Sequence, residues 1–370
     1  MRRVAHKHHA PKHTGARTTR VGPKSFRFFI LPALIISSAA VLWGCSQEEK
    51  QDAALPPVPF VTAQSLFSVD ALSTDHVWIT GFNATVLHTA DGGRTWQQVR
   101  ITDLPTNVYD VSFADERNGW IAAGEGRIFQ TTDGGATWSV LATGTDKYLL
   151  SIFFVDRHNG WAAGEFGTVI HTSDGGLTWA SQGWGEDRIY NDVYFTDRLH
   201  GWIVGEYGLI YHTADGGETW DKQECKEIIP VVSADEWLEP TPSLYGVWFV
   251  DAARGFAAGM DGIIITTEDG GKSWQKIKSG VEGEKVTLFA LQTRGDRAWA
   301  VGQKGTYLYS EDRGTTWDMR RNSTNTRFWI RALDFSDERN GWAVGSRGTI
   351  LKTGNGGTSW DMISGIPVSP

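Results

Sequence analysis

The chain has 370 residues, of which 35 are Lys or Arg and 43 are Asp or Glu, and its formal net charge is −8. Residues 1–44 hold eight of the basic residues and no acidic one, so the chain without them carries 27 minus 43, about −16. An acidic chain without a basic stripe argues against nucleic acid as a partner. Cys225 is the one cysteine besides Cys45, so no intramolecular disulfide is expected.

The first 44 residues have the pattern of an export signal. Basic side chains lead into an apolar run at residues 28–41, and this run is too short to span a bilayer comfortably. Leu42-Trp43-Gly44-Cys45 resembles a lipobox, which predicts that Cys45 is lipidated and begins the mature protein. The alternative is an uncleaved anchor, because Trp43 stands where a small residue is usual.

Residues 45–62 are polar and then rich in proline. This composition predicts a tether that holds the remaining domain, residues 63–370, to a membrane. The expected location is therefore outside the cytoplasm, with the domain facing the periplasm, a lumen or the cell exterior.

The rest of the chain is built on a repeated eight-residue pattern, which reads TTDGGATW at residues 131–138. Successive copies are 42, 41, 41, 54, 43 and 43 residues apart. A period of about forty residues predicts one small sheet per repeat, as in propellers. The copies end at Trp96, Trp138, Trp179, Trp220, Trp274, Trp317 and Trp360.

Each residue type in the pattern suits a turn between two strands. The aspartate can accept hydrogen bonds from backbone NH groups that follow it, and the glycines supply positive φ. The tryptophan is expected to begin a strand and to bury a large apolar area against the neighbouring sheet. The pattern is therefore interpreted as scaffold, with aspartates at Asp91, Asp133, Asp174, Asp215, Asp269 and Asp312 and with Asn355 in the seventh copy.

A second pattern, NGWIAAG at residues 118–124, precedes the turn and has relatives in the other repeats. The second repeat then reads as four short strands, at residues 108–113, 120–123, 127–131 and 137–140. Seven such units predict an all-β fold, a seven-bladed β-propeller with four-stranded antiparallel blades and an Asp-box turn in each blade. The blades are expected at residues 63–100, 105–142, 147–183, 188–224, 243–279, 285–321 and 327–364.

The Ser/Thr-x-Asp-x-Gly-x-Thr-Trp pattern resembles the Asp-box, or BNR repeat, of sialidase-like and sortilin-like propellers. Together with the Asn-Gly-Trp segments, it most resembles the photosystem II stability and assembly factor family, over residues 60–366. The resemblance implies a non-enzymatic, extracytoplasmic or lumenal propeller that binds a membrane-protein subunit during assembly. It does not name the client or show that the organism is photosynthetic.

In a blade with strands A to D from the centre outward, the B/C and D/A connections share one face, and the Asp-box and A/B turns share the other. The B/C loops keep flanking glycines around a variable pair of residues, and loops that vary on a rigid scaffold are typical binding sites. An insertion at residues 225–242 falls on the same face. This face is therefore predicted to bind the partner.

The residues predicted to bind the partner are basic side chains of the sixth and seventh blades and tryptophans that neither repeated pattern accounts for. The other interpretation is that the tryptophans pack under loops and that the arginines pair with acidic neighbours. The candidates are Lys304, Arg320, Arg321, Arg327, Arg331, Arg347, Trp184, Trp237 and Trp329.

The alternative function is a sialidase-like glycoside hydrolase or a glycan-binding propeller, because this face also has Arg188, Tyr207 and several carboxylates. Against it, the Phe-Arg-x-Pro signature of sialidases is absent near the first blade. One carboxylate in each separated turn supplies too few ligands for calcium. No catalytic residue, metal or cofactor is expected, and the protein is predicted to be a monomer.

Overall fold

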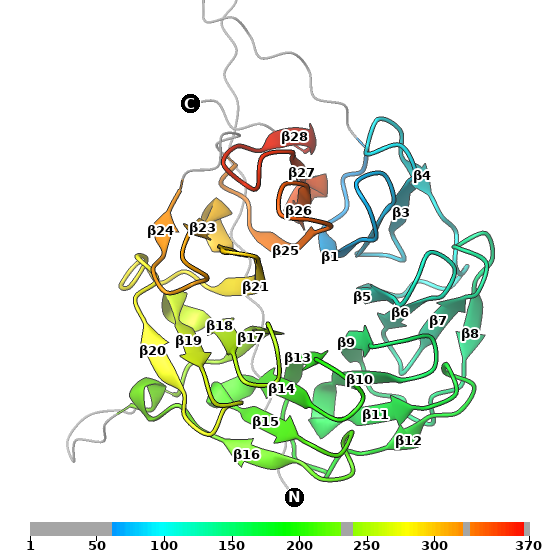
Figure 1. The fold of residues 1–370 in the computed structure, drawn as a ribbon. Helices are drawn as coiled ribbons and strands as arrows, with labels where there is room; N and C mark the ends of the chain where they lie inside the picture. Colours follow the sequence, from blue (N-terminus) through cyan, green and yellow to red (C-terminus); the bar gives the residue numbers. More distant parts are fainter. Residues whose placement is uncertain (1–60, 231–239, 321–325, 366–370) are drawn as a thin grey trace, which may run out of the picture. The chain divides into compact units, whose positions relative to one another are not determined.

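Seven four-stranded antiparallel sheets surround a central axis in the computed structural model, which describes residues 61–230, 240–320 and 326–365 (Figure 1). The first strand of each sheet (strand A) lies nearest the axis and the fourth (strand D) lies at the rim. The predicted seven-bladed propeller is confirmed. Cys45, Trp237 and Arg321 lie outside the described residues, as do the predicted signal peptide and most of the tether.

Each blade uses four consecutive strands. Blades 1 to 4 consist of β1 (Leu66–Ala71), β2 (Val77–Gly81), β3 (Val86–Thr89), β4 (Gln97–Gln98); β5 (Val108–Phe113), β6 (Gly119–Ala123), β7 (Ile128–Thr131), β8 (Ser139–Leu141); β9 (Leu149–Phe154), β10 (Gly160–Gly164), β11 (Val169–Thr172), β12 (Ala180–Ser181); and β13 (Tyr190–Phe195), β14 (Gly201–Gly205), β15 (Ile210–Thr213), β16 (Asp221–Gln223).

Blades 5 to 7 follow the same order. They consist of β17 (Leu244–Phe249), β18 (Gly255–Gly259), β19 (Ile264–Thr267), β20 (Gln275–Ile277); β21 (Leu288–Arg294), β22 (Arg297–Gly302), β23 (Tyr307–Ser310), β24 (Asp318–Met319); and β25 (Ile330–Phe335), β26 (Gly341–Gly345), β27 (Ile350–Thr353), β28 (Asp361–Ser364). Short 3-10 turns are η1 (Glu165–Gly167), η2 (Glu206–Gly208), η3 (Lys226–Ile228), η4 (Met260–Gly262), η5 (Gln303–Gly305) and η6 (Ser346–Gly348). No helix within the described ranges is long and apolar enough to cross a membrane.

The Asp-box turn determines where strand D begins. In blade 2, the Asp133 carboxylate accepts hydrogen bonds from the Thr137 backbone NH at 2.9 Å and the Thr137 hydroxyl at 2.7 Å. Thr131 Oγ1 in turn accepts the Gly135 NH at 2.8 Å. Because Thr137 is held in the turn, β8 starts at Ser139, two residues later than predicted. In every blade the Asp-box tryptophan lies just before strand D rather than in it.

Aromatic side chains fill the space between neighbouring blades. Trp120 of β6 is fully buried, stacks on Phe154 of β9 with ring centroids 3.5 Å apart, and donates Nε1 to the Gly175 carbonyl at 3.0 Å. Trp179, the Asp-box tryptophan of that next blade, meets Phe154 edge-on at 6.0 Å. The blade core therefore depends most on the tryptophan of the second strand (strand B).

The Asp-box tryptophans are buried less uniformly than predicted. The four of blades 1 to 4, Trp138 among them, are only half-buried, whereas the three of blades 5 to 7 are at most 6% exposed. Trp138 contacts Trp78 and Phe113 edge-on, and its indole N–H has no partner. The expectation that Trp138 is a deeply buried side chain is therefore wrong, since its ring lies at the outer margin of the interface.

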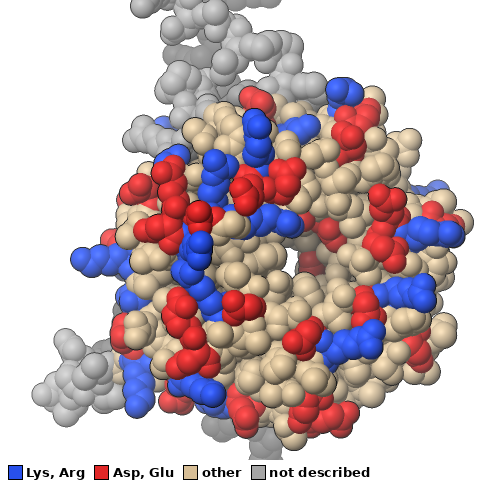
Figure 2. All heavy atoms as spheres, in the orientation of Figure 1, with Lys and Arg blue, Asp and Glu red and all other residues tan. Residues whose placement is uncertain are grey.

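The ring closes between blades 7 and 1 without a shared strand, since each of these sheets is formed by one continuous stretch of chain. Near the axis, the Ala71 NH donates to Asp334 Oδ2 at 2.7 Å. On the Asp-box side, Lys352 Nζ donates to the Gly92 carbonyl at 2.7 Å, and on the opposite side the Gly348 NH donates to the Gln64 carbonyl at 2.8 Å. Hydrogen bonds near the axis, on the Asp-box side and on the opposite side thus join blades 7 and 1 and close the ring. A central opening remains in the space-filling view, and side chains of both charges lie around it on the face shown (Figure 2).

Candidate functional site

The B/C loops and D/A connections form one face, which we call the loop face. The Gly167 NH in the B/C loop of blade 3 donates to the Arg188 carbonyl in the connection to blade 4, at 2.7 Å. The Gly262 NH in blade 5 donates to the Val286 carbonyl in the next connection, also at 2.7 Å. The two kinds of loop are therefore bonded together around the ring, as the sequence predicted.

The variable residue at the tip of each B/C loop is held outward by an unusual backbone conformation. Phe166, Tyr207 and Lys304 have φ values of 54°, 55° and 56°, in the left-handed region that non-glycine residues rarely adopt. The glycine that follows is required, since a Cβ at Gly167 would collide with the Glu186 carbonyl oxygen. The loop shape is thus fixed by glycine, while the tip side chain is free to vary. In blades 2 to 7 the tips are Glu125, Phe166, Tyr207, Asp261, Lys304 and Arg347, whereas in blade 1 Asn83 and Ala84 have φ of 55° and 51° without a glycine.

Exposed large apolar side chains are concentrated on the loop face. Phe166 and Tyr207 are 56% and 51% exposed. Among the described residues, every exposed aromatic side chain belongs to a B/C loop or a D/A connection: Phe82, Tyr148, Phe166, Trp184 and Tyr207. In the described Asp-box and A/B turns, the exposed large apolar side chains are all aliphatic: Leu177, Leu199 and Val250.

A row of aromatic rings crosses the loop-face mouth of the channel over blades 7, 1 and 2. Phe67 of β1 stacks on Trp329, just before β25, at 6.4 Å and on Tyr109 of β5 at 5.8 Å. Tyr109 in turn lies 6.1 Å from the exposed Tyr148. We call Trp329, Phe67, Tyr109 and Tyr148 the aromatic row.

The predicted basic residues do not form one cluster. Arg347 lies 4.8 Å over the Phe328 ring, and Lys304 Nζ donates to the Glu284 carbonyl at 3.1 Å. Arg327 is exposed in the connection between blades 6 and 7. Arg320 packs over Tyr309 and its guanidinium pairs with Glu311 of an Asp-box turn at 3.3 Å, so it is directed away from the loop face.

Arg331 was predicted in a connection, but it lies in β25 and lines the channel. Its guanidinium is 4.9 Å from the Phe289 ring and 5.7 Å from the Tyr245 ring. Burial lowers the pKa of Arg331. The channel cavity has a volume of about 550 Å³.

The predicted tryptophans are also separated. Trp184 is 40% exposed and contacts Tyr211 of blade 4 at 4.4 Å, whereas Trp329 belongs to the aromatic row on the other side of the ring. The interpretation that these tryptophans pack against neighbours therefore holds in part for both. Each still presents part of its ring on the loop face.

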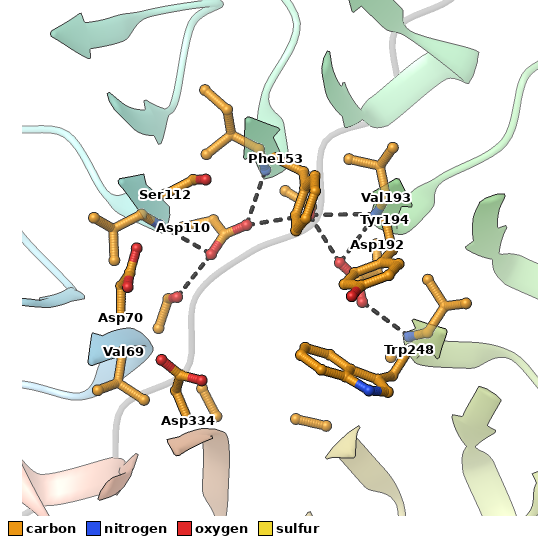
Figure 3. A pocket seen from close by; sticks show the side chains of 18 of the residues that line it. Val69, Asp70, Asp110, Ser112, Phe153, Asp192, Val193, Tyr194, Trp248 and Asp334 are labelled. Carbon is orange, nitrogen blue, oxygen red and sulfur yellow. Dashed lines mark hydrogen bonds between the residues drawn. The ribbon is translucent and has the colours of Figure 1, made fainter. Parts of the chain in front are cut away.

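Four aspartates line the channel, and the sequence analysis did not identify them. Asp110 accepts the Ile152 NH of the next blade at 2.8 Å, Asp192 accepts the Val247 NH at 2.9 Å, and Asp70 accepts the Phe113 NH at 2.7 Å. Together with the bond from the Ala71 NH to Asp334, each aspartate joins one strand A to the next. Figure 3 shows the four side chains around the channel and the bonds of Asp110 and Asp192. Acidic residues inside otherwise apolar first strands were the signal that could have revealed them.

Burial of these carboxyl groups along the channel wall disfavours their charge. Burial raises the pKa of Asp192 to about 7, and burial with the neighbouring Asp334 carboxylate raises the pKa of Asp70 well above its ordinary value. Ser151 Oγ lies 2.8 Å from Asp192 Oδ1 and 3.1 Å from Asp110 Oδ2. The Ser151 hydroxyl has one hydrogen and can donate it to only one of the two carboxyl groups. Protonation of Asp110 or Asp192 would supply the hydrogen for the other contact.

Across the channel from Asp70 and Asp334 stand three aromatic side chains, Phe153, Tyr194 and Trp248 (Figure 3). Tyr194 lies 4.7 Å from Phe153 and 4.9 Å from Trp248. The channel polar groups mainly bond to adjacent blades, which favours a structural role for this layer. In the described part of the chain, no group of three or more His, Cys, Asp or Glu side chains is arranged to hold a metal ion.

The comparisons with known proteins agree with this architecture. The family described as photosynthesis system II assembly factor YCF48 matches residues 101–186, 184–236 and 234–328, which is more than half of the chain. The photosystem II assembly protein Ycf48 of Synechococcus sp. (strain JA-2-3B'a(2-13)) is 37% identical over 51 residues, 13% of this chain and 15% of that protein. The matched stretch thus spans well under two thirds of this curated relative.

Solved structures share the fold at low sequence identity. A structure of YCF48 bound to a D1 peptide superposes with a TM-score of 0.66 at 20% identity, covering 80% of this chain and 95% of that one. A GH74 xyloglucanase from Xanthomonas campestris gives a TM-score of 0.65 at 11% identity, covering 83% and 56%. On the family match, the chain belongs to the photosynthesis system II assembly factor YCF48 family.

Proposed function

We propose that the loop face binds an extended segment of a membrane-complex subunit, and that the protein is a non-enzymatic assembly factor. The observation that carries this proposal is that exposed aromatic side chains occur on one face only within the described residues, beside the exposed basic residues Lys304, Arg327 and Arg347. Aromatic and arginine side chains contribute most strongly to binding when a partner covers them. The family supports a protein client, because a similar YCF48 was solved with a D1 peptide.

The proposal also covers where the protein is located and how it is attached to the membrane. Residues 1–44 act as a lipoprotein signal peptide, Cys45 carries the lipid, and residues 45–62 tether a monomeric propeller to the membrane outside the cytoplasm. This part rests on the sequence pattern alone. Metabolic labelling with a fatty acid, lost in Cys45→Ser, is the expected result; labelling that persists in this variant would contradict it.

Binding is tested with a matched pair of charge reversals in the full-length chain. Arg327→Glu with Arg347→Glu changes the loop face, and Arg94→Glu with Lys272→Glu changes exposed positions on the Asp-box side. Glutamate fits the left-handed position of Arg347, because Glu125 has the same conformation in blade 2. The D1 peptide is the first probe, and subunits that co-purify with the wild-type protein are the second.

The expected result is that the loop-face pair weakens binding at least tenfold while the Asp-box pair leaves it unchanged. Loss of binding in the Asp-box pair alone would show that the partner occupies the other face. Unfolding curves of both variants serve as the folding control.

A glycan ligand is the second candidate, because exposed rings beside the channel can stack on sugars and the fold is shared with a xyloglucanase. The geometry gives it less support. Arg188 lies over Tyr207 in blades 3 and 4, whereas Arg347 lies over Phe328 at blade 7, so these arginines do not converge on one ligand carboxylate. Hydrolysis of xyloglucan or a sialoside by the purified protein would favour this candidate.

A further inference from the structure

The charged residues at the tips of the B/C loops are separated by sign around the ring. The B/C loops of blades 2 to 5 carry Glu125, Glu165, Glu206 and Asp261, and those of blades 6 and 7 carry Lys304 and Arg347. The B/C loop of blade 1, residues 82–85, is uncharged. We call the first group the acidic arc and the second, with Arg327, the basic arc.

The basic arc is held by neutral groups. Lys304 is bonded to a backbone carbonyl and Arg347 to an aromatic ring, so neither charge is cancelled by a carboxylate. Arg331, at the channel beside this arc, likewise contacts rings. A cation held in this way keeps its attraction for an external anion.

Carboxylates of the acidic arc and of the adjoining connection also bond to neutral groups. The Glu206 carboxylate accepts the Ile189 NH at 3.1 Å, and Glu186, in the adjoining connection, accepts the Tyr211 hydroxyl at 2.8 Å. Some basic residues do lie in this sector: Arg127 pairs with Glu125, Lys147 pairs with Asp146 at 2.8 Å, and Arg188 lies 5.1 Å from the Tyr207 ring centroid. Lys226 and Lys278 are exposed in the connections on either side of blade 5. Glu165, Glu206 and Asp261 have no such ion pair within the described chain.

The aromatic row lies between the two arcs, over blades 7, 1 and 2, where the loop of blade 1 has no charge. A partner that passes along the channel mouth from blades 6 and 7 over blade 1 to blade 2 therefore meets cations, then aromatic rings, then carboxylates. Turning the partner around would place like charges together, which is a direct penalty against the wrong orientation. The field is screened within about 8 Å at physiological salt, so it acts on groups in contact with the face.

We propose that the loop face binds its partner segment in one orientation, with acidic residues of the segment on the basic arc, apolar residues on the aromatic row and basic residues on the acidic arc. This inference rests on the proposed function and adds the order of charges that the segment must have. A uniformly acidic segment would be attracted to the basic arc but repelled by the acidic arc.

The test uses synthetic peptides of one composition. The block peptide has four glutamates, a Leu-Phe-Leu centre and four lysines; the control has the same residues with the charges alternating. Each carries a photo-crosslinker at one end, and binding to the full-length protein is measured before crosslinking. The block peptide should bind about tenfold more tightly than the alternating one.

The crosslinks establish the orientation. A crosslinker at the glutamate end should label the loops of blades 6 and 7, and one at the lysine end should label those of blades 3 to 5. A variant with the arcs exchanged, Glu165→Lys, Asp261→Lys, Lys304→Glu and Arg347→Glu, should reverse these labels. Lysine fits at position 261 because Lys304 has nearly the same backbone conformation, with φ of 56° against 57°.

Equal labelling of both arcs by each end, or equal affinity of the two peptides, would overturn the inference. The proposed function would survive that outcome as long as the client is lost from the Arg327→Glu and Arg347→Glu variant. If the client stays bound to that variant, the proposed function fails and the inference fails with it.

Discussion

The two faces of this propeller hold several of their charged side chains differently. On the Asp-box face, charged side chains pair with close neighbours, as in Arg198 with Asp156 at 2.7 Å and Arg313 with Asp296 at 2.7 Å. On the loop face, Lys304 and Arg347 contact a carbonyl and a ring instead. Paired charges stabilise turns, whereas unpaired charges remain available to a partner. The difference indicates that repetition serves the fold and that variation serves binding.

The largest expected effect concerns the repeated core. Trp120→Ala removes a fully buried ring that stacks on Phe154 and bonds to Gly175, and it should lower the free energy of unfolding by about 3 to 5 kcal/mol. Trp138→Ala should cost less, roughly half as much, because this ring is half-buried. Urea unfolding measures both. Equal decreases in the free energy of unfolding would show that the two tryptophan positions contribute equally to stability.

A substitution on the loop face should lower client affinity more than it lowers stability. Trp329→Ala removes a ring that the proposed partner covers, so we expect client affinity to fall about tenfold, as for an aromatic hot spot. Its effect on unfolding should stay below about 1.5 kcal/mol, since the ring is half-buried and, among the described residues, stacks on Phe67. Isothermal titration together with urea unfolding separates the two quantities. Unchanged affinity would remove the aromatic row from the binding site.

The buried aspartates of the channel should make the protein less stable as the pH rises from 4 to 7. The pKa of Asp192 is raised to about 7 in the folded protein, so its contribution to stability is fully present below about pH 4 and is lost as the pH rises through 7. Asp192→Asn should therefore flatten the dependence of the melting temperature on pH between 4 and 7. The remaining slope would come from Asp70, Asp110 and Asp334, whose pKa values are also raised, and with opposite sign from His88, His171 and His212, whose pKa values burial lowers. An unaltered slope in the variant would contradict this account.

The smallest effect is expected at a single Asp-box. Hydrogen bonds from Thr178 lower the pKa of Asp174 to about 2, so its contribution is present above about pH 4 and is lost as the pH falls toward 2. Asp174→Asn should remove this part of the acid sensitivity and keep the turn. Asn355 shows how, since its side chain accepts the Ser359 NH at 3.0 Å and donates to the Ser359 hydroxyl at 2.8 Å. Acid titration of the unfolding transition provides the check, and disruption of blade 3 would contradict it.

The repeated parts of this structure could be predicted and the unrepeated parts could not. Seven copies of one turn determine blade number and strand order, because each copy must begin and end the same four strands. Asp110 and Asp192 share the third position of strand A in blades 2 and 4, where the other blades have Ser, Gly or Ala, so the repeat as a whole does not reveal that this position faces the channel. Arg331 and Trp329 are two residues apart in the sequence, yet one enters the channel and the other stacks on Phe67, because the start of β25 lies between them.

Hydrogen–deuterium exchange of the full-length protein with and without its client tests the central claim most directly. We predict that bound client slows exchange in the B/C loops and D/A connections, in particular at residues 303–305 and 346–348, and leaves the seven Asp-box turns unchanged. The Arg327→Glu and Arg347→Glu variant should lose this protection. Slower exchange in the Asp-box turns, with none in the B/C loops, would contradict the account.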